Sequence, residues 1–214
     1  MAMTEGLGVG RFLWNNYNLM DFMDRKIIDM RQDAIKQEYK SIHDPYVFIA
    51  GQRYSFIENK IFDEKISIYL PEDFIDMPQV FAKRKFPLEN RPKIIKTNIE
   101  TSINFGFNWY ENEETITALE IPKIVLNIRQ LFMKVSPHYN YFDYKVQHQN
   151  DNKSILIGWF DYTSPTIYTP VYSFQGFMPI DKKIFHIFFT CEDTIYEHWK
   201  PIVLQIIQTI KKEG

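Results

Sequence analysis

Residues 182–212 carry two hydrophobic patterns in succession, and together they limit the folds open to this chain. The first, KIFHIFFTC ending at Cys191, is an apolar run of strand length. The second is a broad apolar stripe at helical spacing, made of Ile195, Trp199, Ile202, Val203, Ile206, Ile207 and Ile210. A buried strand that runs into such a helix needs a shared core. We therefore predict an α+β domain closed by a helix over residues 194–212, with Pro201 either kinking that helix or delaying its start to Trp199.

Alternating and helical periodicities divide the middle of the chain. Period-two alternation predicts strands over residues 66–70, 99–109, 142–148, 154–162 and 167–178. Helical spacing predicts a short helix that begins near Pro78 and a longer one over residues 122–134. Hairpin-length connections between most of the strands indicate a mostly antiparallel sheet covered by helices.

A methionine-rich helix is predicted over residues 19–41, after a glycine-rich start that we expect to be flexible. Met20, Met23, Ile27 and Met30 recur at alternating three- and four-residue steps, as in a coiled-coil seam. Methionine surfaces suit varied apolar partners. The seam either packs on its own sheet or faces a partner, a second copy of the chain included. We expect a flexible N-terminus and amphipathic helix over residues 1–45, and a domain over residues 46–214.

Composition narrows the class of protein. Hydrophobic residues make up 45% of the chain and aromatic residues 16%, ample for a core. The formal net charge of −2 argues against nucleic acid as the main partner. No apolar run approaches the roughly 20 residues of a membrane-spanning helix, and the N-terminus lacks a secretory pattern. With Cys191 as the single cysteine, we expect a cytoplasmic protein.

Two passages resemble a known fold family. The passage IYLPEDF, residues 68–74, is similar to the opening of PsbP-like domains. The passage from IFHIFFTC, residues 184–191, to YEHWKPI, residues 196–202, resembles the closing strand and helix of the DcrB-like branch. That branch includes the Eag chaperones of type VI secretion effectors, and the sandwich also occurs in a eukaryotic Ran-GTPase release factor. Over residues 54–212 the resemblance implies a three-layer α/β/α sandwich that binds other proteins, with no catalytic residues to carry over.

Candidate chemistry is sparse. The five histidines, His43, His138, His148, His186 and His198, show no zinc-site spacing, so we expect no metal. Five-residue spacing on one strand sends His186 and Cys191 to opposite faces, which argues against a catalytic pair. Gly6, Gly8 and Gly10 lack the context of a phosphate-binding loop, and two acidic clusters, Glu72/Asp73/Asp76 and Glu111/Glu113/Glu114, are typical of solvated turns. We expect no cofactor and no catalytic site.

Two sets of residues are candidates for partner binding besides the methionine seam. The segment 83–96 holds six cations, among them Lys83, Arg84 and Lys85, against one acid, Glu89. It either binds an acidic or phosphate-bearing partner or is a solvated surface. An apolar lining for a client is predicted on the sheet at Phe105, Phe107, Trp109 and Trp159, with Tyr172 and Phe174. The alternative is that these aromatic residues belong to the core.

Taken together, the patterns and the resemblance predict a non-catalytic chaperone or adaptor. Its partner would be a client protein, such as a secreted effector, whose apolar segment it shields. One alternative is a structural subunit that docks through its N-terminal helix, with a homodimer as one such assembly. Another is a hydrolase that uses Cys191 or a carboxylate pair.

Overall fold

The computed structural model describes residues 26, 41–89, 91–111, 113–152 and 155–213. By its contacts the chain divides into two compact units, Met1–Lys40 and Ser41–Gly214. The predicted methionine seam, Met20, Met23, Ile27 and Met30, lies outside the described residues. The second unit contains every strand and helix discussed below.

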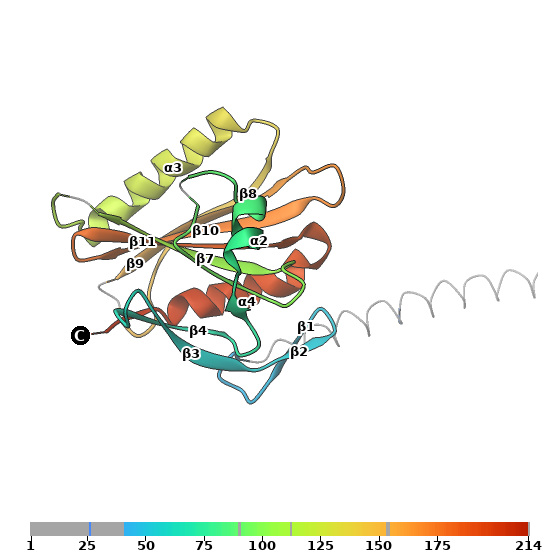
Figure 1. The fold of residues 1–214 in the computed structure, drawn as a ribbon. Helices are drawn as coiled ribbons and strands as arrows, with labels where there is room; N and C mark the ends of the chain where they lie inside the picture. The colour runs from blue at the N-terminus through green and yellow to red at the C-terminus, as the bar shows by residue number, and fades with distance from the viewer. Residues whose placement is uncertain (1–25, 27–40, 90, 112, 153–154, 214) are drawn as a thin grey trace, which may run out of the picture. The chain divides into compact units, whose positions relative to one another are not determined.

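An antiparallel sheet forms the centre of this unit (Figure 1). In the described part of the chain it has seven strands, in the order β5-β6-β7-β11-β10-β9-β8. Their bounds are β5 (Ile75–Asp76), β6 (Ile94–Thr97), β7 (Asn104–Glu111), β8 (Asn140–His148), β9 (Leu156–Ser164), β10 (Val171–Ile180) and β11 (Lys183–Glu192). A smaller sheet has the order β12-β4-β3, with β3 (Phe56–Ile61), β4 (Ile66–Pro71) and β12 (Lys211–Lys212). Strands β1 (Val47–Ile49) and β2 (Gln52–Tyr54) form a separate hairpin.

Helices cover both faces of the large sheet, which makes three layers (Figure 1). On one face lies α3 (Ile121–Val135), preceded by the 3-10 turn η1 (Ala118–Glu120). On the other face α4 (Tyr196–Gln208), preceded by η2 (Asp193–Ile195), packs together with the small sheet. The seven-residue helix α2 (Gln79–Lys85) joins β5 to β6. The predicted α+β sandwich closed by a C-terminal helix is confirmed.

Strand alternation sorts the large side chains into two cores. The main core lies beneath α4, where Trp199, Ile202 and Ile206 are fully buried against Phe105, Phe185 and other residues of the sheet. A smaller core on the opposite face holds Ile121 and Val125 of α3 against Phe160 and Phe177. The α2 end of that face is closed by a contact between the rings of Phe86 and Phe188, whose centroids are 5.4 Å apart.

Side-chain packing on this second face requires glycine at position 106 of β7. A Cβ placed there would lie 1.8 Å from a ring carbon of Phe188 on the neighbouring strand. Gly106 therefore leaves room for the Phe188 ring over β7, where that ring also contacts Phe86.

The C-terminal helix is shorter than its apolar periodicity predicts. It ends at Gln208. Lys211 and Lys212 pair with Ser67 and Ile66 of β4, respectively, instead of extending the helix to residue 212. The apolar stripe continues to Ile210, which is buried. Periodicity alone does not distinguish a helical last turn from an extended one when the same residue is buried in both.

Two predicted strands begin later than expected. The strand predicted over residues 99–109 begins at Asn104, because residues 98–102 form the turn of a hairpin with β6. Asn98 accepts a hydrogen bond from the Ile103 amide at 2.9 Å, and Ile99 is 83% exposed at the tip. The strand predicted over residues 167–178 begins at Val171, which leaves Ile167 and Tyr168 in a loop.

Candidate functional site

An open groove of about 370 Å³ lies between α2 and the strand β6. Lys83 and Ala82 of α2 line one side, and Arg91, Lys93 and Ile95 line the other. The two sides come together because the chain turns back after α2, where the Arg91 amide donates to the Leu88 carbonyl at 3.1 Å. The Met77 amide also donates to the Ile95 carbonyl at 2.8 Å. We call this feature the α2–β6 groove.

Positive charge dominates the α2–β6 groove. Lys83, Arg91 and Lys93 line it, with Glu89 as the acidic residue of the lining. None of these three cations forms an ion pair with another described residue. In contrast, the ammonium group of Lys96 in β6 lies 3.0 Å from the Asp76 carboxylate. Unpaired cations around a groove create a local positive potential that attracts an anionic group.

Large apolar side chains are exposed on α2 and in the turn that follows it. Val80 is 78% exposed, Leu88 69% and Phe81 49%. A single exposed apolar residue is ordinary, but several on one short helix and the turn after it are typical of a protein-binding surface. The surface therefore offers apolar contacts and cations together, a combination that suits a segment that is both apolar and acidic.

The predicted cations of α2 occupy different environments. Lys83 lines the groove, and Arg84 is exposed on the next position of the helix. The Lys85 ammonium group instead turns away and donates to the Thr101 carbonyl, in the β6–β7 turn. Partial burial lowers the pKa of Lys85, and nearby Glu192 opposes that shift. Of the three, Lys83 is the one that the structure places in a groove.

The predicted aromatic lining faces the main core. Phe105 and Phe107 are fully buried beneath α4, and Trp159 is 3% exposed. Trp109 is half-buried at the end of β7, where its ring centroid lies 5.0 Å from that of Phe62. The Lys183 ammonium group lies over the face of the Trp109 ring. A partner has no access to the first three side chains while α4 is in place, so accessible apolar contacts lie on the α2 surface instead.

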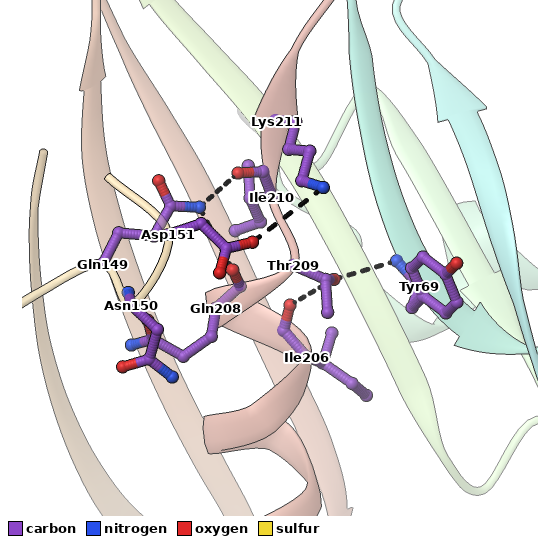
Figure 2. A network of polar contacts seen from close by, with 9 residues as sticks. All are labelled: Tyr69, Gln149, Asn150, Asp151, Ile206, Gln208, Thr209, Ile210 and Lys211. Carbon is purple, nitrogen blue, oxygen red and sulfur yellow. Dashed lines mark hydrogen bonds and ion pairs between the residues drawn. The ribbon is translucent and has the colours of Figure 1, made fainter. Parts of the chain in front are cut away.

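A second, larger groove of about 570 Å³ lies at the C-terminal end of α4. Several of its lining residues belong to the polar network in Figure 2, in which Gln149 donates to the carbonyls of Gln208 and Ile210. The Thr209 hydroxyl donates to the Ile206 carbonyl at 2.7 Å and accepts from the Tyr69 amide at 3.0 Å. These bonds satisfy carbonyls that a helix end leaves open. They also explain why α4 stops where it does.

Polar groups in this second groove are largely used within the protein. Gln205 accepts from the Ile42 amide at 3.1 Å, and Gln208 accepts from the Asn150 amide at 2.7 Å. Lys211 lies 3.9 Å from Asp151 (Figure 2). These groups stabilise the end of α4. The better candidate for binding is therefore the α2–β6 groove, whose cations form no ion pair within the described part of the chain.

Neither Cys191 nor His186 has the surroundings of a catalytic group. Cys191 is buried beneath α4, and burial raises the pKa of its thiol far above the usual range. His186 lies on the opposite face, stacked on Phe177 at 4.6 Å, with its Nε2 2.8 Å from Gln175 Oε1. No group of three or more histidine, cysteine or carboxylate side chains in the described ranges is placed to hold a metal ion.

Burial of His186 predicts a dependence of stability on pH. Burial lowers the pKa of His186 from 6.5 to about 4, so below pH 6.5 the unfolded chain takes up a proton that the folded chain does not. The free energy of unfolding should therefore fall between pH 6.5 and pH 4, by about 1.4 kcal/mol for each pH unit that the two pKa values differ. In urea titrations across this range, His186→Gln should show a shallower fall than the wild type. Parallel curves would contradict this.

A buried charge network, which the sequence did not predict, joins α4 to the sheet. Asp161 of β9 is fully buried, and its carboxylate lies 2.6 Å from the Lys200 ammonium. It also accepts from the Tyr172 hydroxyl at 2.8 Å and from the Asp143 amide at 2.7 Å. Desolvation and the Asp161 carboxylate raise the pKa of Tyr172. Each charged or polar group of this network has a partner within it. We therefore interpret the network as a structural link between α4 and the sheet.

Comparison with known proteins shows the fold. No protein-family model matches the chain, and neither does any curated protein. The solution structure of cyanobacterial PsbP from Synechocystis has a TM-score of 0.53 and 6% identity, over 75% of this chain and 94% of that one. The Ran-binding protein Mog1p of Saccharomyces cerevisiae has a TM-score of 0.48 and 8% identity, over 74% and 96%. The predicted PsbP-like fold is confirmed. Membership of the DcrB-like or Eag branch stays a prediction.

No helix in the described residues is long and apolar enough to cross a membrane.

Proposed function

We propose that this chain is a non-catalytic binding protein, a chaperone or adaptor, that shields an apolar and acidic segment of a client protein in its α2–β6 groove. The observation that carries the proposal is the groove itself. Lys83, Arg91 and Lys93 line it without an ion pair to any described residue, together with the apolar residues Met77, Ala82 and Ile95. Val80 and Phe81 are exposed elsewhere on α2. A client such as a secreted effector would supply the segment.

Electrostatic and apolar contacts would have separate roles in this binding. The cations speed association and select an acidic segment, and they do so less at high salt. The apolar side chains supply the area that is removed from water. In the same proposal the methionine seam, Met20 to Met30, is a second apolar contact for the client. It rests on the sequence alone.

A pair of synthetic peptides tests the groove directly. One is an amphipathic peptide with glutamate on its polar face, and the other has lysine at each of those positions. We expect the acidic peptide to bind in a fluorescence-anisotropy titration and the basic peptide to bind at least about tenfold more weakly. Raising the salt concentration should weaken the acidic peptide's binding.

Matched variants place the binding site. Lys83→Glu with Lys93→Glu should weaken binding of the acidic peptide by at least about tenfold, because both substitutions reverse a charge in the groove. Lys65→Glu with Lys145→Glu makes the same change in net charge at exposed positions elsewhere and should leave binding nearly unchanged. Equal losses in the two double variants would show that net charge, and not the groove, determines binding.

Capture of bound proteins from an extract of the native host would identify the client. We expect the wild type to retain a protein that the Lys83→Glu, Lys93→Glu variant does not, and deletion of residues 1–41 should weaken that capture if the methionine seam contributes. A retained protein that is unaffected by both changes would contradict the proposed binding surface.

A further inference from the structure

A rigid apolar tip projects from the β9–β10 hairpin. Within this loop Ile167 is 89% exposed and Tyr168 88%. The Thr166 hydroxyl accepts from the Tyr168 amide at 3.1 Å and donates to the Thr169 carbonyl at 2.9 Å. Prolines at positions 165 and 170 restrict the backbone on either side. A loop held in one conformation loses little entropy when it docks.

Acidic side chains lie beside this tip. Glu192 is exposed and pairs in the ladder with Val171, where the loop returns to the sheet. The Asp193 amide donates to the Pro170 carbonyl at 2.9 Å, which holds the start of η2 against the loop. Two cations lie near this end. Lys85 is close to Glu192, whose charge opposes the lowering of the Lys85 pKa by burial. Lys200 is paired with Asp161 and Asp143. The tip is an apolar pair, and Glu192 is the exposed acidic residue beside it.

The α2–β6 groove has the complementary character. It is lined by Lys83, Arg91 and Lys93, none of which forms an ion pair with a described residue, and by the apolar residues Met77, Ala82 and Ile95. An isoleucine and a tyrosine on a preformed loop are side chains of the kind that anchor protein interfaces. One chain thus carries both an apolar tip with acidic neighbours and an apolar groove with basic ones.

We propose that the β9–β10 tip of one copy of this chain docks in the α2–β6 groove of a second copy. Ile167 and Tyr168 would contact the apolar residues of the groove, and Glu192 would face Lys83, Arg91 and Lys93. One loop tip buries much less surface than a stable protein interface does, so the association is weak and reversible. The proposal rests on the same groove as the proposed function, and it makes self-association and client binding compete.

Self-association of the full chain is the direct test. Sedimentation velocity over a range of protein concentrations should show a reversible shift from monomer to larger species. Ile167→Asp with Tyr168→Asp should weaken that association by at least about tenfold, and so should Lys83→Glu with Lys93→Glu. Both changes are at exposed positions, and circular dichroism confirms that each variant is folded. Leu119→Asp, at a residue 86% exposed in η1, should have no effect.

Mixing the two defective variants gives the sharpest result. The tip variant keeps an intact groove, and the groove variant keeps an intact tip, so an equimolar mixture should associate although neither variant does so alone. A mixture that stays monomeric overturns the proposal. So does a wild type that is monomeric at every concentration, or an association that survives both double substitutions.

The acidic peptide separates this proposal from the proposed function. It should dissociate wild-type assemblies, because it occupies the groove that receives the tip. If the groove variant loses peptide binding while the tip variant self-associates normally, tip docking is wrong and the proposed function stands. If tip and groove variants both lose self-association and peptide binding is unaffected, tip docking stands and the proposed function is wrong.

Loss of binding to phosphatidylcholine vesicles in the tip variant, with self-association unchanged, would assign the tip to a lipid surface instead.

Discussion

Replacing Asp161 with alanine should lower the free energy of unfolding by about 3–5 kcal/mol. Asp161 is fully buried and accepts from the Tyr172 hydroxyl and the Asp143 amide, and it lies 2.6 Å from the Lys200 ammonium. Its removal leaves a buried hydroxyl and a backbone amide without their acceptor and takes a partner from Lys200, whose side chain is 20% exposed. Urea unfolding followed by circular dichroism measures the loss.

Asp143 provides a matched control for the Asp161 prediction. Its carboxylate is also 2.6 Å from the Lys200 ammonium, but its side chain is 63% exposed. Water replaces an exposed partner at little cost, so Asp143→Ala should lower stability by about 0–1 kcal/mol. Equal losses for the two substitutions would mean that burial of Asp161 does not determine the strength of the network.

Replacing Trp199 with alanine should lower the free energy of unfolding by about 3–5 kcal/mol. Trp199 is fully buried in the main core, where α4 meets the β1–β2 hairpin and the large sheet. Its ring lies 5.1 Å from that of Tyr54 and 5.5 Å from that of Phe189. Alanine leaves a cavity between α4, the hairpin and the large sheet, and these elements cannot all close on it. Thermal and urea unfolding measure the effect.

Trp199→Phe tests whether ring volume explains that loss. Phenylalanine keeps an aromatic ring and removes an indole N–H that has no hydrogen-bond partner among the described residues. We expect a loss of about 1–2 kcal/mol. Leu119→Ala, at an exposed position, should change stability by less than about 0.5 kcal/mol. A phenylalanine variant as unstable as the alanine variant would show that shape, and not volume, controls this position.

Much of the fold follows from local periodicity. The spacing of apolar residues identified α3, α4 and most strands of the large sheet, because a helix face and a strand face repeat at different intervals. The same argument assigned Trp199, Ile202 and Ile206 to the core, where the structure places them. Element ends were less predictable. Lys211 and Lys212 pair with β4, and no local pattern indicates that a distant strand will be available.

The candidate site was only partly visible in the sequence. The cluster of cations over residues 83–96 pointed to the α2–β6 groove, but the lining residues Lys83, Arg91 and Lys93 were not distinguishable from Lys85, which turns away to Thr101. The exposed pair Ile167 and Tyr168 was assigned to a strand. The flanking prolines at 165 and 170 were the signal that a loop begins and ends there.

For the strand and helix of residues 182–212, the sequence by itself determined that both elements form and which side of the helix is buried. These properties depend on residues a few positions apart. Tertiary structure decided where the helix ends, which aromatic residues are accessible and which charges are paired. Lys200 meets Asp161, and Phe105 lies beneath α4, only because segments far apart in the chain pack together. Exposure and pairing are properties of that packing, so no local pattern encodes them.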